Sequence, residues 1–238
     1  MNKKFKFLGY GVLDWILLLT GLISGIVVGI VYDSPWFIIV NTILATICVF
    51  TQAKGQVINQ FIGIVYFIFY IYISFKQKLY GEAILYLVIM LPMYIYGAIH
   101  WITHRQKEEN LVLVRNNLSK KEWGLMSLGF VIVSVGVFFL LKALNTSELV
   151  VSTLSFITML PAVYLLIRRC KWNQVAFLVN DFIVPILWLL LIINGELILL
   201  PMIINFVFQI IYDSYGLVEW IKLEKKQKNQ KDKDEQKF

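Results

Sequence analysis

Long apolar runs follow one another along almost the whole chain, separated by short polar segments. A helix needs about 20 residues to cross the core of a bilayer, and eight of the runs are close to that length. They cover residues 12–31, 36–53, 56–75, 80–101, 123–143, 149–167, 173–193 and 196–220. The runs are continuous, whereas the strands of a membrane barrel alternate between apolar and polar positions. The pattern predicts an all-α integral membrane protein with about eight transmembrane helices.

Composition and charge agree with a membrane protein. Of the 238 residues, 59% are hydrophobic and only 16% are charged, against about 25% charged in a soluble domain. The net charge of +7 does not indicate nucleic acid binding, because Lys and Arg lie only between and beyond the apolar runs. Cys48 and Cys170 fall inside or at the edge of these runs, so we expect no structural disulfide.

Basic residues are distributed unequally between the two sides of the expected bundle. If the N-terminus is cytoplasmic, the cytoplasmic segments hold 19 Lys and Arg residues and the outer segments hold only three, Lys76, Lys78 and Lys142. Basic loops are retained on the cytoplasmic side of a membrane. We therefore expect both termini to be cytoplasmic, which also favours an even number of helices.

The fourth and eighth runs share short sequence patterns. Each opens with Gly-Glu-x-Ile-Leu, at Gly81 and Gly195, and each closes with Tyr-Gly-x-x-x-Trp, ending at Trp101 and Trp220. The spacing between the two patterns differs by five residues, so the similarity is a hint of an internal repeat. Runs two to four and runs six to eight would cross the membrane in the same directions. Such parallel repeats are a transporter architecture, with the substrate site between the halves.

The repeat divides the chain into five expected segments. Residues 1–35 hold an N-terminal cytoplasmic segment and an extra helix, and residues 102–148 hold a basic cytoplasmic loop and a linker helix. The two three-helix repeats cover residues 36–101 and 149–221. Residues 222–238 form a charged cytoplasmic tail, which we expect to be frayed helix or disordered because it cannot bury a core.

Two acidic residues lie deep within apolar runs. Asp181 is ten residues beyond Lys171, and Asp213 is nine residues before Lys222, so each is about 15 Å inside a helix that rises 1.5 Å per residue. Polar groups at this depth usually face a cavity or the interior of a bundle, although hydrogen bonds between helices are the simpler explanation for any single Asn or Gln. Without an intramembrane Lys or Arg, the two acids suit hydroxyl groups, a cation or a proton.

Sequence motifs of enzymes are missing. The chain contains no GxxxxGK[ST] nucleotide loop, no HExxH and no GxSxG, so we expect neither ATP hydrolysis nor another enzymatic activity, and no cofactor. His100 and His104 are four residues apart, but no acid or cysteine completes a metal site, and we interpret them as interfacial packing residues.

Several short stretches, taken in order, resemble one known family. They are Lys54-Gly55-Gln56-Val57-Ile58-Asn59, Leu79-Tyr80-Gly81-Glu82, Leu91-Pro92-Met93 followed by Gly97 and Trp101, then Trp172, Asn180, Trp188, Asn194-Gly195 and Tyr215-Gly216-Leu217-Val218-Glu219-Trp220. Over residues 36–220 the chain resembles the Pnu-type vitamin transporters. It differs from the nicotinamide riboside carriers of that family at Tyr94, Ala98 and Val175, where those carriers usually have an amide, a Trp and a Trp.

The resemblance implies a fold and an activity. The fold is a 3+1+3 helix core similar to that of the SWEET sugar transporters, with the first run as an additional helix. The activity is facilitated diffusion of nicotinamide riboside into a bacterial cell across its cytoplasmic membrane, with trapping by a cytoplasmic kinase. It further implies a homo-oligomer, with a trimer expected. Thiamine, riboflavin and deoxynucleosides are alternative substrates, since relatives are known for them.

Together, the intramembrane polar residues and the resemblance define a candidate site. Its expected ligand-binding residues are Asn59, Tyr66, Tyr94, Asn180, Asp181, Trp188, Asn205, Gln209 and Asp213. Aromatic faces would stack on the ring of the ligand, amides would bind hydroxyl groups, and the two acids would favour a positive charge. Two rival hypotheses stay open, a proton-coupled carrier that uses Asp181 and a non-transporting scaffold or sensor that recruits a partner through its basic tail.

Overall fold

The structure is a computed structural model, and it describes residues 6–7, 10–106, 109–115, 118–146 and 148–235. Within these residues, eight helical segments are long and apolar enough to cross a membrane, which confirms the expected number. Seven of these crossings are formed by the helices α1 Val12–Val31, α2 Trp36–Ala53, α3 Ile58–Lys76, α6 Lys120–Ala143, α7 Leu149–Ile167, α8 Asn173–Ile193 and α9 Leu200–Glu235. The short 3-10 helix η2 Leu197–Leu199 precedes α9.

The fourth crossing is built from three pieces, α4 Tyr80–Leu85, the π-helix η1 Tyr86–Met90 and α5 Leu91–Thr103. The widened π-turn lies directly before Pro92, the second residue of α5. A proline inside a helix lacks an N–H group and its ring clashes with the carbonyl group four residues earlier. A widened turn removes that clash while the helix continues, and such turns are common near functional sites.

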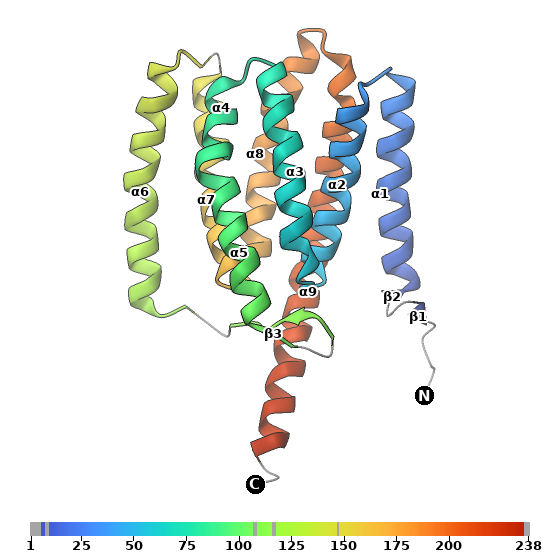
Figure 1. The fold of residues 1–238 in the computed structure, drawn as a ribbon, viewed down its shortest axis with the longest axis vertical. Coiled ribbons are helices and arrows are strands. Elements are labelled where there is room, and N and C mark those ends of the chain that lie inside the picture. The colour runs from blue at the N-terminus through green and yellow to red at the C-terminus, as the bar shows by residue number, and fades with distance from the viewer. Residues whose placement is uncertain (1–5, 8–9, 107–108, 116–117, 147, 236–238) are drawn as a thin grey trace.

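Two small antiparallel hairpins, β1 Lys6–Phe7 with β2 Tyr10–Gly11 and β3 Arg105–Gln106 with β4 Leu111–Val112, lie at one end of the bundle. Figure 1 shows that the long C-terminal extension of α9 projects from the same end. We call this the hairpin end, and the opposite one the far end. The described parts of the two chain ends thus lie together, as an even number of crossings requires.

Helix α1 lies on the outside of the bundle against α2 and α9. Its buried face consists of Asp14 and three glycines spaced four residues apart, Gly21, Gly25 and Gly29. A Cβ atom at Gly25 would lie only 2.6 Å from Cγ2 of Thr42 on α2. Small residues at this spacing allow helix backbones to approach closely in a membrane, which explains how α1 packs without large side chains.

The C-terminal tail differs from our expectation, because α9 continues as a regular helix to Glu235. The tail packs on β4 and the residues that follow it, and on the turn before α8. Gln227 accepts a hydrogen bond from the backbone N–H of Val114 and donates one to the carbonyl oxygen of Val112, both at 2.9 Å, and Lys171 pairs with Glu224 at 2.7 Å. The sequence hides these contacts because each is a polar pair made over a long separation in the chain.

Candidate functional site

A closed cavity of about 40 Å³ lies in the middle of the bundle, between α2, α3, η1 and α5 on one side and α7, α8 and α9 on the other. Six of the nine expected site residues line it, and these are Tyr66, Tyr94, Asn180, Asp181, Gln209 and Asp213. They come from α3, α5, α8 and α9, so the cavity is formed by helices that are far apart in the sequence. About 10–15 Å³ of such space is enough for one water molecule, so the cavity has room for a few water molecules.

Asp181 of α8 and Asp213 of α9 lie side by side in the wall of this cavity. Each is only 2% exposed, and both side chains line the same cavity. Gln52 of α2 donates a long hydrogen bond of 3.5 Å to Oδ1 of Asp213, whereas Oδ2 of Asp181 has no partner among the described residues. The pair therefore has an unused acceptor beside the cavity.

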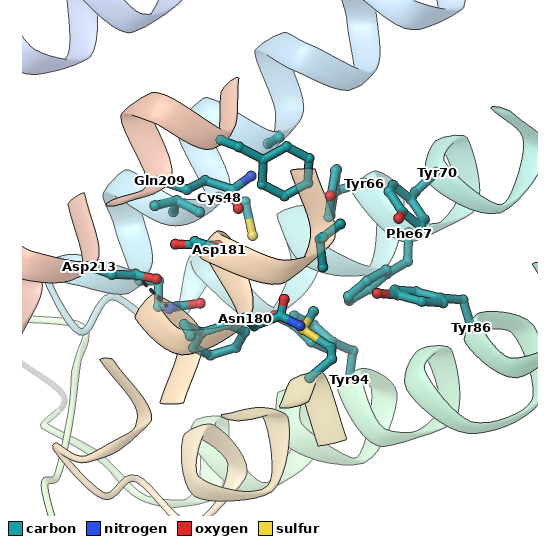
Figure 2. Close-up of a pocket in the computed structure, with 17 residues that line it drawn as sticks. Cys48, Tyr66, Phe67, Tyr70, Tyr86, Tyr94, Asn180, Asp181, Gln209 and Asp213 are labelled. Atoms are coloured by element: carbon teal, nitrogen blue, oxygen red, sulfur yellow. Dashed lines mark hydrogen bonds between the residues drawn. The ribbon is translucent and has the colours of Figure 1, made fainter. Parts of the chain in front are cut away.

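Aromatic rings form the wall opposite the acids (Figure 2). Tyr66, Phe67 and Tyr70 lie on α3, where they meet Tyr86 of η1 and Tyr94 of α5. Their ring centres are close, 4.6 Å between Phe67 and Tyr94 and 4.8 Å between Tyr70 and Tyr86. The Tyr94 ring lies directly over Gly63, where a Cβ atom would be 2.3 Å from it. Electron-rich ring faces opposite two acids make this a suitable environment for a flat cation.

The other three expected residues do not line the cavity. Asn59 is fully buried and donates a 2.8 Å hydrogen bond to the carbonyl oxygen of Cys48. Asn205 accepts a long hydrogen bond of 3.5 Å from the hydroxyl group of Thr46, and Trp188 packs edge-on against Tyr70 with ring centres 5.6 Å apart. These residues connect the helices that line the cavity. The sequence alone left this interhelical role open for any single Asn or Gln.

Several lining residues were not among those expected. Cys48 and Gln52 on α2, and Phe67, Tyr70 and Tyr86 opposite the acids, are the main ones. Tyr70 and Tyr86 do belong to stripes of polar and aromatic residues in their runs. Phe67 carries no signal in the sequence, because a phenylalanine in an apolar helix is most often packed in a core.

A further buried acid lies nearer the far end. Glu82 of α4 is 2% exposed, and its Oε1 accepts a 2.8 Å hydrogen bond from the hydroxyl group of Tyr70. Its Oε2 has no partner in the described part of the chain. Because Tyr70 also lines the cavity, this bond joins the cavity wall to the start of the fourth crossing.

At the hairpin end, two tryptophans make matching contacts. Nε1 of Trp101, on α5, donates a 3.0 Å hydrogen bond to the carbonyl oxygen of Leu166 in α7. Nε1 of Trp220, on α9, donates a 2.8 Å hydrogen bond to the carbonyl oxygen of Gln52 in α2. Both acceptors are the second-last residue of their helix. The two rings have centres 5.9 Å apart, so they close this end of the bundle between the cavity and the tail helix.

Next to the tryptophans, Lys54 at the end of α2 ties three helices together. Its ammonium group lies 2.6 Å from Asp14 of α1 and 3.1 Å from Glu219 of α9, and it donates a 2.6 Å hydrogen bond to the hydroxyl group of Tyr215. Burial lowers the pKa of Lys54, but the hydrogen bonds to these three partners outweigh burial and raise the pKa above its usual value. Lys54 therefore stays charged at neutral pH and fixes α1 to the bundle.

A bundle of eight membrane-length helices around a closed cavity with acids on one wall and aromatic rings on the other has the architecture of a membrane transporter. Comparisons with known proteins give the family. The family model described as "Nicotinamide mononucleotide transporter" matches residues 35–222, and the chain belongs to this family. The expected Pnu-type family is thereby confirmed, and the chain is a multi-pass membrane transporter and not an enzyme.

Relatives and a solved structure agree. The chain is 24% identical over 220 residues to the nicotinamide riboside transporter PnuC of Neisseria mucosa, an alignment that covers 91% of this chain and 82% of that protein. It is 25% identical over 115 residues to the nicotinamide riboside transporter PnuC of Haemophilus influenzae, which covers 48% and 50%. The crystal structure of the vitamin B3 transporter PnuC has a TM-score of 0.82 at 24% identity, covering 93% of this chain and 95% of that one. That likeness confirms the all-helical fold.

Proposed function

We propose that this chain carries nicotinamide riboside into a bacterial cell across the cytoplasmic membrane, by facilitated diffusion. The observation that carries the proposal is the pair of buried acids Asp181 and Asp213, which face a wall of aromatic rings across a central cavity. Nicotinamide riboside is a positively charged, flat pyridinium ring joined to a ribose, so its two ends match the two kinds of group. The names of both relatives support the same substrate.

The proposed binding mode uses each wall for one part of the ligand. The pyridinium ring stacks on Tyr66 and Tyr94, where the ring faces attract a cation. Asp181 and Asp213 offset the positive charge, and the unpaired Oδ2 of Asp181 accepts a hydrogen bond from a ribose hydroxyl group. The side-chain amide of Gln209 binds the ribose or the carboxamide. Asn59, Trp188 and Asn205 do not contact the ligand and instead position the residues that line the cavity.

Transport requires the cavity to expand. A volume of about 40 Å³ is far below the roughly 300 Å³ or more of a ligand pocket, so the conformation described is a closed one. We propose that residues 36–101 and 149–221 are the two halves of a parallel repeat, joined by residues 102–148, and that they rock against each other. The matching bonds of Trp101 and Trp220 support this, because each joins the third helix of one half to the first helix of the other.

The rest of the proposal concerns topology and partners. The hairpin end is the cytoplasmic one, supported by the basic residues that gather there. Residues 1–35 are a cytoplasmic segment followed by an extra helix beside the core, and residues 222–238 are a cytoplasmic tail. Without an energy-coupling motif, net uptake needs a cytoplasmic kinase that phosphorylates the substrate and traps it. We propose a homotrimer in the membrane.

The test is uptake of radiolabelled nicotinamide riboside into liposomes that contain the purified protein, with thiamine, riboflavin and deoxynucleosides as competitors. We expect saturable uptake without an imposed gradient, competed only by unlabelled nicotinamide riboside. Uptake of another compound in its place would move the specificity to Tyr94, Ala98 and Val175. Absence of uptake for all of them would contradict the proposal.

Proton coupling is a second candidate, favoured by the two buried carboxyl groups that lie side by side in the cavity wall. It predicts that a protonophore abolishes concentrative uptake into liposomes with an imposed pH gradient. Facilitated diffusion predicts the same rate with and without the protonophore.

The scaffold hypothesis is tested by deleting residues 223–238, because a transporter keeps most of its uptake without this helix, whereas a scaffold that acts through its tail loses its function.

A further inference from the structure

Helix α6 is joined to the bundle mainly through α7 and stands at its edge (Figure 1). Between α6, the fourth crossing and α7 lies an open groove of about 590 Å³. Its walls are mostly apolar and include Met93 of α5, Leu125, Met126, Phe130 and Val133 of α6, and Leu160 of α7. The groove is separate from the central cavity, since no residue lines both.

The groove becomes polar at the hairpin end. Ser119, Lys121 and Glu122 line it there. Glu122 forms ion pairs with Arg115, at 2.9 Å, and with Arg168, so its negative charge is already neutralised. The side chain of Lys121 is exposed and has no ion pair among the described residues.

Arg169 does not itself line the groove, but it adds a positive charge at this end, where its backbone carbonyl oxygen accepts a 3.0 Å hydrogen bond from the N–H of Arg115. One of its guanidinium nitrogens donates to the carbonyl oxygen of Leu113 at 3.1 Å, but its Nε is buried and has no partner in the described residues, and the same holds for Nε of Arg168. Burial and the nearby guanidinium groups of Arg115 and Arg168 lower the pKa of Arg169. The cluster thus contains more positive charge than Glu122 can neutralise.

An apolar groove that opens sideways into a bilayer and ends in unneutralised positive charge matches one kind of ligand. We propose that it binds an anionic phospholipid, with an acyl chain along Leu125, Phe130 and Val133 and with the phosphate group held by Lys121 and Arg169. Basic pockets between transmembrane helices are known to bind anionic head groups in this way. A second copy of the chain is the other candidate occupant, but it does not account for the unneutralised positive charge at the end of the groove.

Two glycines of α6 provide a matched pair of variants. A Cβ atom would meet nothing within 4 Å at either Gly129 or Gly124, but only Gly129 lines the groove. Gly129→Leu therefore fills the groove without a clash, while Gly124→Leu adds the same side chain to an open surface. Leu also favours a helix more than Gly does, so neither variant is expected to impair folding.

The experiment is native mass spectrometry of the protein released from nanodiscs that contain equal amounts of phosphatidylglycerol and phosphatidylcholine. We expect phosphatidylglycerol to be retained at least fivefold more often. Gly129→Leu and the double variant Lys121→Gln/Arg169→Gln should each abolish that preference. Gly124→Leu and Lys76→Gln/Lys142→Gln, which removes two exposed charges at the far end, should keep it.

Three results would overturn the proposal. They are equal retention of the two lipids, a preference that survives Gly129→Leu, and a change in the oligomeric mass of Gly129→Leu, which would identify the groove as a contact between copies of the chain. None of them bears on the transported substrate, so this proposal and the proposed function fail independently.

Discussion

Asp181 and Asp213 are the residues on which the account depends most. Burying two acids in a membrane is costly, and among the residues that the structure describes no Lys or Arg lines the cavity to pair with them. The long hydrogen bond from Gln52 to Asp213 stabilises them only in part. A positively charged ligand would complete this arrangement, which gives the pair a function that interhelical packing alone does not explain.

Replacement of either acid by its amide should separate function from stability. Asp181→Asn and Asp213→Asn keep the shape of the side chain, and we expect each to lower uptake at least tenfold with little loss of thermal stability, since a buried charge is removed. Asp33→Asn is the control, because it removes one exposed charge in a turn with positive φ, where Asn is tolerated. Normal uptake by both cavity variants would exclude these residues from the site.

Gly63 should be needed for the position of the Tyr94 ring. In Gly63→Ala the new methyl group would lie 2.3 Å from that ring, so the ring must move into the cavity or away from it. We expect uptake to fall several-fold and the free energy of unfolding to fall by about 1–3 kcal/mol, as for other overpacked sites. Gly136→Ala, where nothing lies within 4 Å, is the matched control, and equal uptake by the two variants would show that the ring position is unimportant.

At the scale of helices, the close packing of α1 depends on its glycines. Gly25→Leu would place a side chain where Thr42 of α2 is already 2.6 Å from the Cβ position. We expect α1 to separate from α2, with a lower melting temperature and weakened contact between Lys54 and Asp14. Val27→Leu on the exposed face of the same helix should melt like the unaltered protein. The measurement is thermal unfolding in detergent, and equal melting of both variants would contradict the role of the glycine face.

The helices themselves were largely predictable. Four of them, residues 12–31, 36–53, 149–167 and 173–193, begin and end where the apolar runs do, because run length and the bilayer fix them. Helix α6 begins at Lys120, before the apolar run, because Ser119 accepts a 3.1 Å capping hydrogen bond from the backbone N–H of Glu122. The π-turn before Pro92 and the tail helix were not predicted, because both depend on contacts that the spacing of apolar residues does not reveal.

The candidate site was predictable in part, and for a clear reason. Depth along a helix follows from counting residues, so Asp181 and Asp213 could be placed near the middle of the membrane. The direction that a side chain faces depends on how helices are rotated against each other. Asn59 and Asn205 are as deeply buried as the acids, yet they face a neighbouring helix, and one sequence does not distinguish the two outcomes.

For the whole molecule, the matching bonds of Trp101 and Trp220 predict how the hairpin end opens. Replacing either Trp by Phe removes its N–H donor, so the buried carbonyl oxygen of Leu166 or Gln52 loses this hydrogen bond. Loss of the bond destabilises the closed state. In a Cys170→Ser background, Cys48 in the cavity wall should then react several-fold faster with a small maleimide. The control Trp36→Phe, at an exposed residue, should leave the reaction rate unchanged. Unchanged rates in Trp101→Phe and Trp220→Phe as well would argue against this gate.

The measurement that tests the central claim most directly compares nicotinamide riboside with its uncharged dihydro form, which is nearly identical in size. Binding of each to the purified protein is measured by isothermal titration calorimetry, for the unaltered chain and for Asp181→Asn/Asp213→Asn. Our account predicts that the unaltered chain prefers the cation at least tenfold and that the double variant loses this preference. Equal binding of the two compounds by the unaltered chain would contradict the claim that the acid pair recognises a positively charged ring.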